Sequence, residues 1–212
     1  MKSEKPNIFI IVGGPGSGKR TQAELLKKYL IEKNPGRCIG HHDNGDNLRR
    51  VVENSLFTNH MRQVIDKAIH TDGITVPGAI TTYLWMRSLL EMNDGKSDMI
   101  FEGVFRTEKE VKQFIVVTDF CMKDSPRYFI HLNVLDEIML KRIKDREDID
   151  GVKRNDDLDE DTIKNRICTY NLESKPIYDE IIHNPDFISL IAKGEQPPEK
   201  VHEYIISYLN LN

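Results

Sequence analysis

The chain has 212 residues, enough for one large domain whose hydrophobic core needs no disulfide or metal to hold it together. Its 30 lysine and arginine side chains are outnumbered by 34 aspartate and glutamate side chains, and the net charge of −4 argues against a generally basic nucleic-acid surface. The longest apolar run near the N-terminus, residues 8–12, is too short to cross a bilayer or to act as a secretory signal. We therefore expect a cytoplasmic protein with no nucleic-acid or membrane partner.

The three cysteines, Cys38, Cys121 and Cys168, are widely separated and form no Cys-x-x-Cys pair. An odd number of distant cysteines does not fit a disulfide framework or a zinc site. The spacing predicts reduced, buried thiols.

Short apolar runs alternate with helical patterns along the whole chain. The runs that predict strands are residues 7–12, 98–105, 128–134 and 187–191. Helical patterns begin near residues 19, 107, 136 and 197. The residues His41-His-Asp43 stand at a further expected strand end, where we interpret them as surface or site lining rather than as a metal centre. This alternation predicts an α/β fold with a parallel sheet covered on both faces.

Two segments interrupt the alternation. Residues 46–92 are almost entirely helical in pattern, with breaks at residues 72–73 and 76–78. Residues 146–161 are dense in charge and lack apolar periodicity, which predicts a surface segment.

The strongest motif is Gly13-Gly-Pro-Gly-Ser-Gly-Lys-Arg-Thr21, which contains G-x-x-x-x-G-K between an expected strand and an expected helix. Its glycines let backbone N–H groups converge on phosphate oxygens, the helix N-terminus adds partial positive charge, and Lys19 supplies an ammonium group. A glycine-rich turn without a ligand is the alternative. Because motif and context agree, we favour a nucleotide site.

Arg20, rather than serine or threonine, follows the lysine, and the hydroxyl comes at Thr21. Here the sequence resembles the adenylate kinase and UMP-CMP kinase family, whose loop reads GxPGxGKGTQ. The residues that match are Gly14, Pro15, Gly16, Gly18, Lys19, Thr21 and Gln22. Arg20 replaces the family's glycine, and both a solvated helix residue and a phosphate contact remain open for it.

Further landmarks follow in family order. The string Asn44-Gly-Asp-Asn-Leu-Arg49 resembles the family's TGDLLR segment, and residues 73–76 resemble its GxxV segment along the acceptor base. The string Glu102-Gly-Val-Phe-Arg106 resembles DGFPR, with a longer acid and a changed middle pair. The resemblance implies that Arg49 and Arg106 hold the acceptor phosphate, because a guanidinium can bind phosphate oxygens bidentately.

Arginines dominate the last landmarks. Arg142 and Arg146, four residues apart on an expected helix, resemble the pair that meets the donor nucleotide, and Arg154 and Arg166 resemble the lid arginines. Without the resemblance, a basic helix face paired with neighbouring acids would be the simpler interpretation. The segment between Arg146 and Arg154 is too short for a zinc-bearing lid, so the chain resembles the short-lid members.

The resemblance implies a P-loop NTPase-type three-layer α/β/α fold with about five parallel strands. We expect one domain, with a core of residues 1–43, 93–145 and 162–212, a helical insertion of about 44–92 that binds the nucleoside monophosphate (NMP), and a short lid of about 146–161. Both insertions are expected to close over the substrates and expel water.

The site residues implied by the resemblance fall into four groups. The catalytic group is Lys19, Arg106, Arg146, Arg154 and Arg166. The ATP-binding group is Gly14, Gly16, Ser17, Gly18, Lys19, Arg20, Thr21, Arg142 and Arg146. The NMP-binding group is Asn44, Arg49, Val76, Gly103, Arg106 and Glu110. The Mg²⁺ group, acting through water, is Thr21 and Glu102.

These expectations predict a monomeric, Mg²⁺-dependent kinase that transfers the γ-phosphoryl group of ATP to an NMP. Glu110 stands where adenylate kinases carry an adenine-reading glutamine, and an ionised carboxylate only accepts hydrogen bonds. AMP is the leading acceptor by resemblance, with CMP, UMP and GMP open. A kinase for another metabolite, or a regulatory nucleotide-binding module with weak catalysis, are the alternatives.

Overall fold

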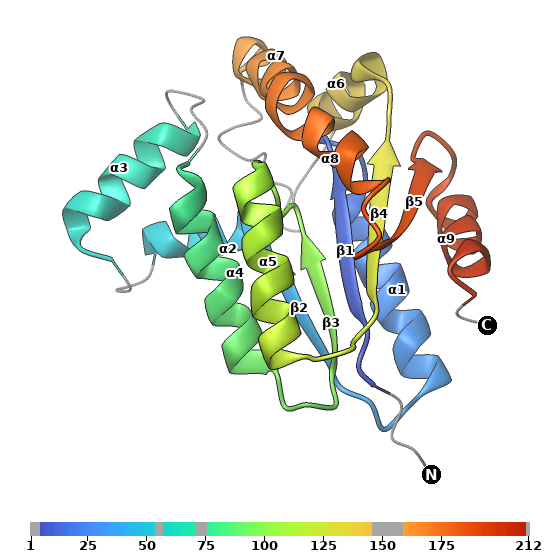
Figure 1. Cartoon of the computed structure of the whole chain (residues 1–212). Helices are drawn as coiled ribbons and strands as arrows, with labels where there is room; N and C mark the ends of the chain where they lie inside the picture. The colour runs from blue at the N-terminus through green and yellow to red at the C-terminus, as the bar shows by residue number, and fades with distance from the viewer. Residues whose placement is uncertain (1–4, 54–56, 71–75, 146–158, 211–212) are drawn as a thin grey trace.

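The computed structural model of the chain describes residues 5–53, 57–70, 76–145 and 159–210 (Figure 1). Its centre is a sheet of five parallel strands in the order β2-β3-β1-β4-β5. In chain order the strands are β1 (Ile8–Gly13), β2 (Ile39–Asp43), β3 (Asp98–Glu102), β4 (Arg127–Asn133) and β5 (Ile188–Lys193). The parallel α/β sheet that the alternation predicted is confirmed.

Strand β1 is the middle strand of the sheet, and every one of its residues is buried. Its side chains alternate between two cores. Phe9 and Ile11 pack beneath helices α1 (Lys19–Lys33) and α9 (Pro198–Tyr208), whereas Ile8 and Ile10 face the opposite layer. A strand that is covered on both faces needs apolar residues at every position, which explains the unbroken apolar run in the sequence.

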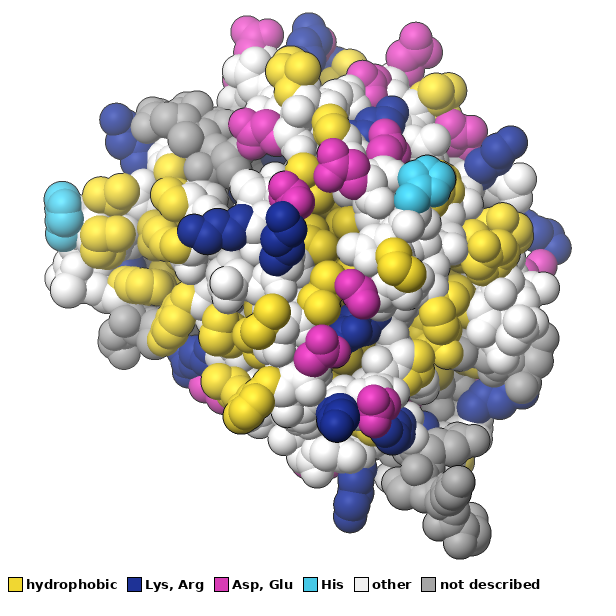
Figure 2. All heavy atoms as spheres, in the orientation of Figure 1, with side chains coloured by type: hydrophobic (Ala, Val, Ile, Leu, Met, Phe, Trp, Pro, Cys, Tyr) yellow, Lys and Arg dark blue, Asp and Glu magenta, His cyan; other side chains and the backbone are white. Residues whose placement is uncertain are grey.

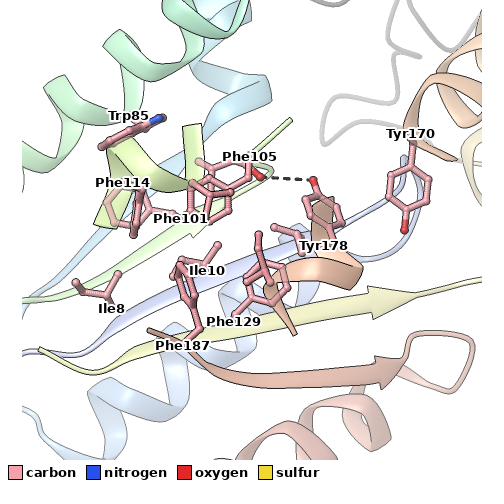
Figure 3. Packing of buried hydrophobic residues seen from close by; sticks show 14 of the residues in the cluster. Ile8, Ile10, Trp85, Phe101, Phe105, Phe114, Phe129, Tyr170, Tyr178 and Phe187 are labelled. Carbon is pink, nitrogen blue, oxygen red and sulfur yellow. Dashed lines mark hydrogen bonds between the residues drawn. The ribbon is translucent and has the colours of Figure 1, made fainter. Parts of the chain in front are cut away.

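The second layer is built around an aromatic cluster (Figure 3). Phe114 of helix α5 (Glu108–Cys121) packs with ring centroids 5.0–5.2 Å from those of Trp85, Phe101 and Phe105. Trp85 belongs to helix α4 (Gly78–Met92), so this cluster fixes both helices against the sheet.

The helical insertion projects to one side of the sheet in Figure 1. It consists of α2 (Asn44–Glu53), α3 (Asn59–His70) and α4, held together by a small apolar cluster of their own. Helix α4 begins just after Pro77, as the expected break at residues 76–78 predicted. The expected break at residues 72–73 lies outside the described residues. The division between α2 and α3 was not predicted.

After β4 the chain continues through α6 (Asp136–Lys144), α7 (Glu160–Thr169), a π-helical turn η2 (Tyr170–Ser174) and α8 (Lys175–Ile181). Most of the expected lid, residues 146–158, lies outside the described residues. Asp159 caps α7 by accepting a hydrogen bond from the Thr162 amide, so the helix starts inside the range expected for the lid.

Two sequence-based expectations need correction. Strand β3 ends at Glu102 rather than at residue 105, because Gly103 and Phe105 have φ angles of 64° and 70° that turn the chain out of the sheet. The cysteines are not buried: Cys38 and Cys168 are exposed and Cys121 is partly exposed.

Acidic and basic side chains are interspersed over the face shown in Figure 2, as a chain with nearly balanced charge would present them. Within the described ranges, none of the helices combines the length and apolar character that crossing a bilayer would require.

Candidate active site

The turn between β1 and α1 is built to approach a ligand closely. Gly16 has a φ angle of 73°, and a Cβ atom there would lie 2.9 Å from the carbonyl oxygen of Met139. A residue other than glycine would therefore be strained and would collide with backbone. Gly18, at the N-cap of α1, is also left-handed, with a φ angle of 92°. The glycine pattern of the sequence is thus required by the geometry of the turn.

Polar groups converge inside this turn. The Lys19 ammonium donates hydrogen bonds of 2.8 Å to the carbonyl oxygens of both Gly13 and Gly14. The hydroxyl of Ser17 is buried, and no described residue hydrogen-bonds to it. A buried hydroxyl without a protein partner is expected where a ligand supplies the hydrogen bond. The turn therefore has the features of an anion site at a helix N-terminus.

A cavity of about 960 Å³ extends from this turn to the insertion and to the α6–α8 region. Its volume lies at the upper end of the range for small-molecule sites. Most of the residues expected to bind substrates line it together. They are Gly16, Ser17, Gly18, Lys19, Arg20, Thr21, Asn44, Arg49, Val76, Glu102, Gly103, Arg106, Arg142 and Arg166. Six of its described lining residues are lysine or arginine and three are acidic, which suits a polyanion.

The cavity wall near α2 carries a cluster of charges around Asp46. One oxygen of this carboxylate lies 2.5 Å from a guanidinium nitrogen of Arg20, and the other oxygen accepts a hydrogen bond from Arg49. Asp43 caps the start of α2 by accepting from the Asp46 amide at 3.0 Å. These contacts fix where Arg49 stands at the cavity edge.

Two carboxylates meet at the ends of neighbouring strands. Asp43 and Glu102 are paired in register across β2 and β3, and both line the cavity, as Thr21 also does. Oε1 of Glu102 lies 2.5 Å from Nε2 of His41. Burial raises the pKa of Glu102, and the hydrogen bond from His41 opposes that rise. Among the described residues, no group of three or more histidine, cysteine or acidic side chains is placed to hold a metal directly.

Glu110 does not line the cavity. Its carboxylate accepts hydrogen bonds from the Thr81 hydroxyl at 2.7 Å and from the amides of Arg106 and Thr107, and only 4% of the residue is exposed. Thr107 and Glu110 form a capping box at the start of α5. Glu110 is therefore neither a solvated surface residue nor a cavity-facing one, the two interpretations that the sequence suggested.

Of the other expected site residues, Arg142 and Gly14 are placed by the structure, whereas Arg146 and Arg154 are not. Arg142 donates to the carbonyl oxygen of Gly194 at 2.8 Å, so it joins α6 to the turn after β5. Gly14 lies in the turn itself, where a Cβ atom would meet the sulfur of Met139 at 2.4 Å. Arg146 and Arg154 lie outside the described residues, and their expected roles stay predictions.

Sequence reasoning missed several cavity residues, among them Tyr170 and Ser174 of the π-helical turn. Tyr170 lies four residues after Arg166, and this helical spacing was the available signal. Its hydroxyl is 2.9 Å from Nε2 of the buried His131, and its ring lies next to Gly14 of the phosphate-binding turn. π-helical turns often occur at functional sites.

Comparison with known proteins agrees with this geometry. The sequence model of a family described as "Adenylate kinase" matches residues 11–184. An adenylate kinase of Leptospira biflexa is 33% identical over 174 residues, which cover 81% of this chain and 83% of that protein. An adenylate kinase of Flavobacterium psychrophilum is 30% identical over 188 residues, which cover 88% of this chain and 90% of the relative.

A solved structure has a similar fold. An unliganded sugar kinase from Janibacter sp. HTCC2649 superposes with a TM-score of 0.57 over 97% of this chain and 95% of that chain. At 18% identity this likeness concerns the fold alone. Taken with the matches in sequence, it places the phosphate-binding turn on a kinase scaffold. The chain therefore belongs to the adenylate kinase family, and it is a phosphotransferase enzyme whose acceptor is a nucleoside monophosphate.

Proposed function

We propose that this enzyme transfers the γ-phosphoryl group of ATP to AMP, giving two molecules of ADP. The observation that carries the proposal is a single cavity that joins the phosphate-binding turn around Lys19 to Arg49 and Arg106. Phosphoryl transfer requires a donor phosphate and an acceptor phosphate in line within one water-poor cleft. A cavity with phosphate-binding groups at both ends meets this requirement.

In this proposal the protein acts by positioning and by electrostatics rather than through a covalent intermediate. The backbone N–H groups of the turn and the Lys19 ammonium hold the donor phosphates, while Arg49 and Arg106 hold the acceptor phosphate. Charge that develops on the transferring group meets cations already in place, so little reorganisation is needed during the reaction. The role of Ser17 is to donate its buried hydroxyl hydrogen to a donor phosphate oxygen.

The residues present also fit a hydrated Mg²⁺ ion. This ion keeps several waters and is usually held by one or two carboxylates. Asp43, Glu102 and the Thr21 hydroxyl border the cavity together, while the described residues hold no cluster that would strip the ion of its water. Mg²⁺ bound together with ATP would neutralise part of the phosphate charge. Asp43 and Glu102 would orient its waters.

The choice of AMP rests on similarity to the relatives named adenylate kinase and on the placement of Glu110. The sequence left CMP, UMP and GMP open because a cavity-facing carboxylate would suit a base that donates hydrogen bonds. Since the Glu110 carboxylate is occupied by Thr81 and two backbone amides, this argument against adenine loses its support.

A coupled assay of nucleoside diphosphate formation across AMP, CMP, UMP, GMP and the deoxy monophosphates tests the proposal. We expect the highest kcat/KM with AMP. A higher kcat/KM with another monophosphate would replace AMP by that acceptor. Tight ATP binding without turnover of any monophosphate would instead favour the regulatory module that the changes at Arg20, Glu102 and Phe105 suggested.

A further inference from the structure

Arg20 is the position at which the phosphate-binding turn departs from its family pattern, and its side chain has a specific partner. The residue is the second of α1, directly after Lys19. Its Nη2 atom lies 2.5 Å from Oδ2 of Asp46, a residue of α2 that is 26 positions away in sequence. The contact therefore joins the donor turn to the helical insertion.

Asp46 is shared between two arginines. Oδ2 faces Arg20, while Oδ1 accepts a hydrogen bond from Arg49 one helical turn further along α2. A carboxylate with both oxygens free can take a guanidinium in a bidentate pair, which uses two donors of that arginine. Because Arg20 occupies one oxygen, Arg49 is held through the other, and its remaining donors stay available at the cavity edge.

The charges of Arg20, Asp46 and Arg49 also bear on whether Arg49 can bind an anion. Asp46 and Arg49 alone would form a neutral pair, and Arg20 adds one positive charge to them, next to the carboxylates of Asp43 and Glu102. The side-chain exposure is 19% for Asp46, 26% for Arg49 and 50% for Arg20, so the solvent screens the contact with Arg49 less than the contact with Arg20. Burial alone would lower the pKa of Arg20, but the carboxylates of Asp46, Asp43 and Glu102 raise it, so the guanidinium stays charged.

We propose that Arg20 is a positioning residue for the acceptor: through Asp46 it orients Arg49 and leaves that guanidinium free to bind the acceptor phosphate. This inference rests on the proposed function for the identity of the acceptor. It differs from both interpretations that the sequence left open, because it assigns the Arg20 side chain to Asp46 rather than to solvent or to a phosphate. The backbone of Arg20 remains part of the helix N-terminus that faces the donor.

A double-mutant cycle tests the inference, with wild type, Arg20→Gln, Asp46→Asn and the double variant. The probe is AMP, measured by calorimetric titration for Kd and by steady-state kinetics for KM. We expect Arg20→Gln to weaken AMP binding about tenfold while the KM for ATP changes less than about twofold. Arg20→Lys should restore part of the loss, because lysine keeps the charge but lacks the planar fork.

The double variant separates positioning from direct contact. If Arg20 acts through Asp46, the loss caused by Arg20→Gln should largely disappear in the Asp46→Asn background. An undiminished loss there, or AMP binding by Arg20→Gln equal to that of wild type, would overturn the inference. Arg87→Gln is the matched control, because Arg87 also pairs with a carboxylate, that of Glu91 at 2.6 Å, on the exposed face of α4.

Binding and turnover are read separately, so the two proposals can fail separately. Wild type that binds AMP in an Arg20-dependent way but turns over no monophosphate would refute the proposed function and leave the inference standing. Normal turnover of AMP with no effect of Arg20→Gln on AMP binding would refute the inference and leave the proposed function standing. If another monophosphate proves to be the acceptor, it replaces AMP as the probe, and absence of binding by all of them would refute both.

Discussion

Nε2 of His41 lies 2.5 Å from Oε1 of Glu102, so the last strand residue of β3 is tied to the neighbouring strand β2 just below the cavity. The carboxylate is almost fully buried, yet it lines the cavity. His41 therefore fixes the orientation of one Glu102 oxygen, and the other oxygen is available to the site.

The first prediction concerns the charge of Glu102. Glu102→Gln keeps the size of the side chain and a hydrogen bond to His41, but it removes one of the two paired carboxylates that line the cavity at the strand ends. Turnover should fall roughly 10–100-fold, and half-maximal activity should require more Mg²⁺, as for other groups that orient metal-bound water. Rates measured against Mg²⁺ concentration at fixed ATP check this. A Mg²⁺ curve identical to that of wild type would remove Glu102 from the metal site.

The second prediction concerns Lys19. Lys19→Met should lower kcat at least about 100-fold, because it removes a cation aimed at developing phosphate charge. The melting temperature should change little, because the two hydrogen bonds that the ammonium donates to the carbonyl oxygens of Gly13 and Gly14 lie within its own turn. Lys28→Met on the exposed side of the same helix is the control and should keep full activity. A Lys19→Met enzyme that stays folded and active would show that the ammonium is dispensable.

The third prediction concerns the aromatic cluster. Phe114 is fully buried among three aromatic rings, and Phe114→Ala should lower the free energy of unfolding by about 3–5 kcal/mol because it leaves a cavity. Phe120 lies on the same helix but is 90% exposed, so Phe120→Ala should change stability by no more than about 0.5 kcal/mol. Urea unfolding of both variants makes the comparison. Equal effects would contradict the packing described.

The fourth prediction concerns pH. Burial lowers the pKa of His131 to about 4, whereas the unfolded chain should titrate near the ordinary value of about 6.5. Between these values the unfolded state binds more protons, so the free energy of unfolding should fall as pH falls from about 6.5 to about 4, by on the order of 3 kcal/mol for this residue. Above about pH 6.5, the titration of His131 should no longer change the free energy of unfolding.

Urea unfolding between about pH 4 and pH 6.5 measures how the free energy of unfolding depends on pH. His131→Gln cannot titrate and should reduce this pH dependence. Part of the remaining dependence should come from His42, whose pKa burial lowers to about 4, and from His202, whose pKa burial also lowers. If wild type and His131→Gln had parallel curves, His131 would not remain neutral in the folded protein. His131→Gln also removes the hydrogen bond between His131 and the Tyr170 hydroxyl, so the variant should be less stable than wild type at neutral pH.

The features that the sequence predicted best were those encoded by adjacent residues. The apolar run of β1, the turn around Lys19 and the start of α6 at Asp136 each depend on a few neighbouring positions. Positions where distant segments meet were predicted less well. The contact of Glu110 with Thr81, 29 residues earlier, could not be predicted, although the capping box that Glu110 forms with Thr107 is a local pattern that the sequence contains. The end of β3 depended on backbone angles that the pattern of apolar residues does not report.

By itself, the sequence determined the parallel α/β scaffold, the phosphate-binding turn and the family resemblance, because each of these is written in local periodicity or in contiguous motifs. Only the tertiary structure decided that Arg20 faces Asp46, that His41 holds Glu102, and that the Tyr170 ring lies next to Gly14. The physical reason is that a side chain's partner depends on which strands and helices become neighbours, and this order, β2-β3-β1-β4-β5, is not the order of the chain.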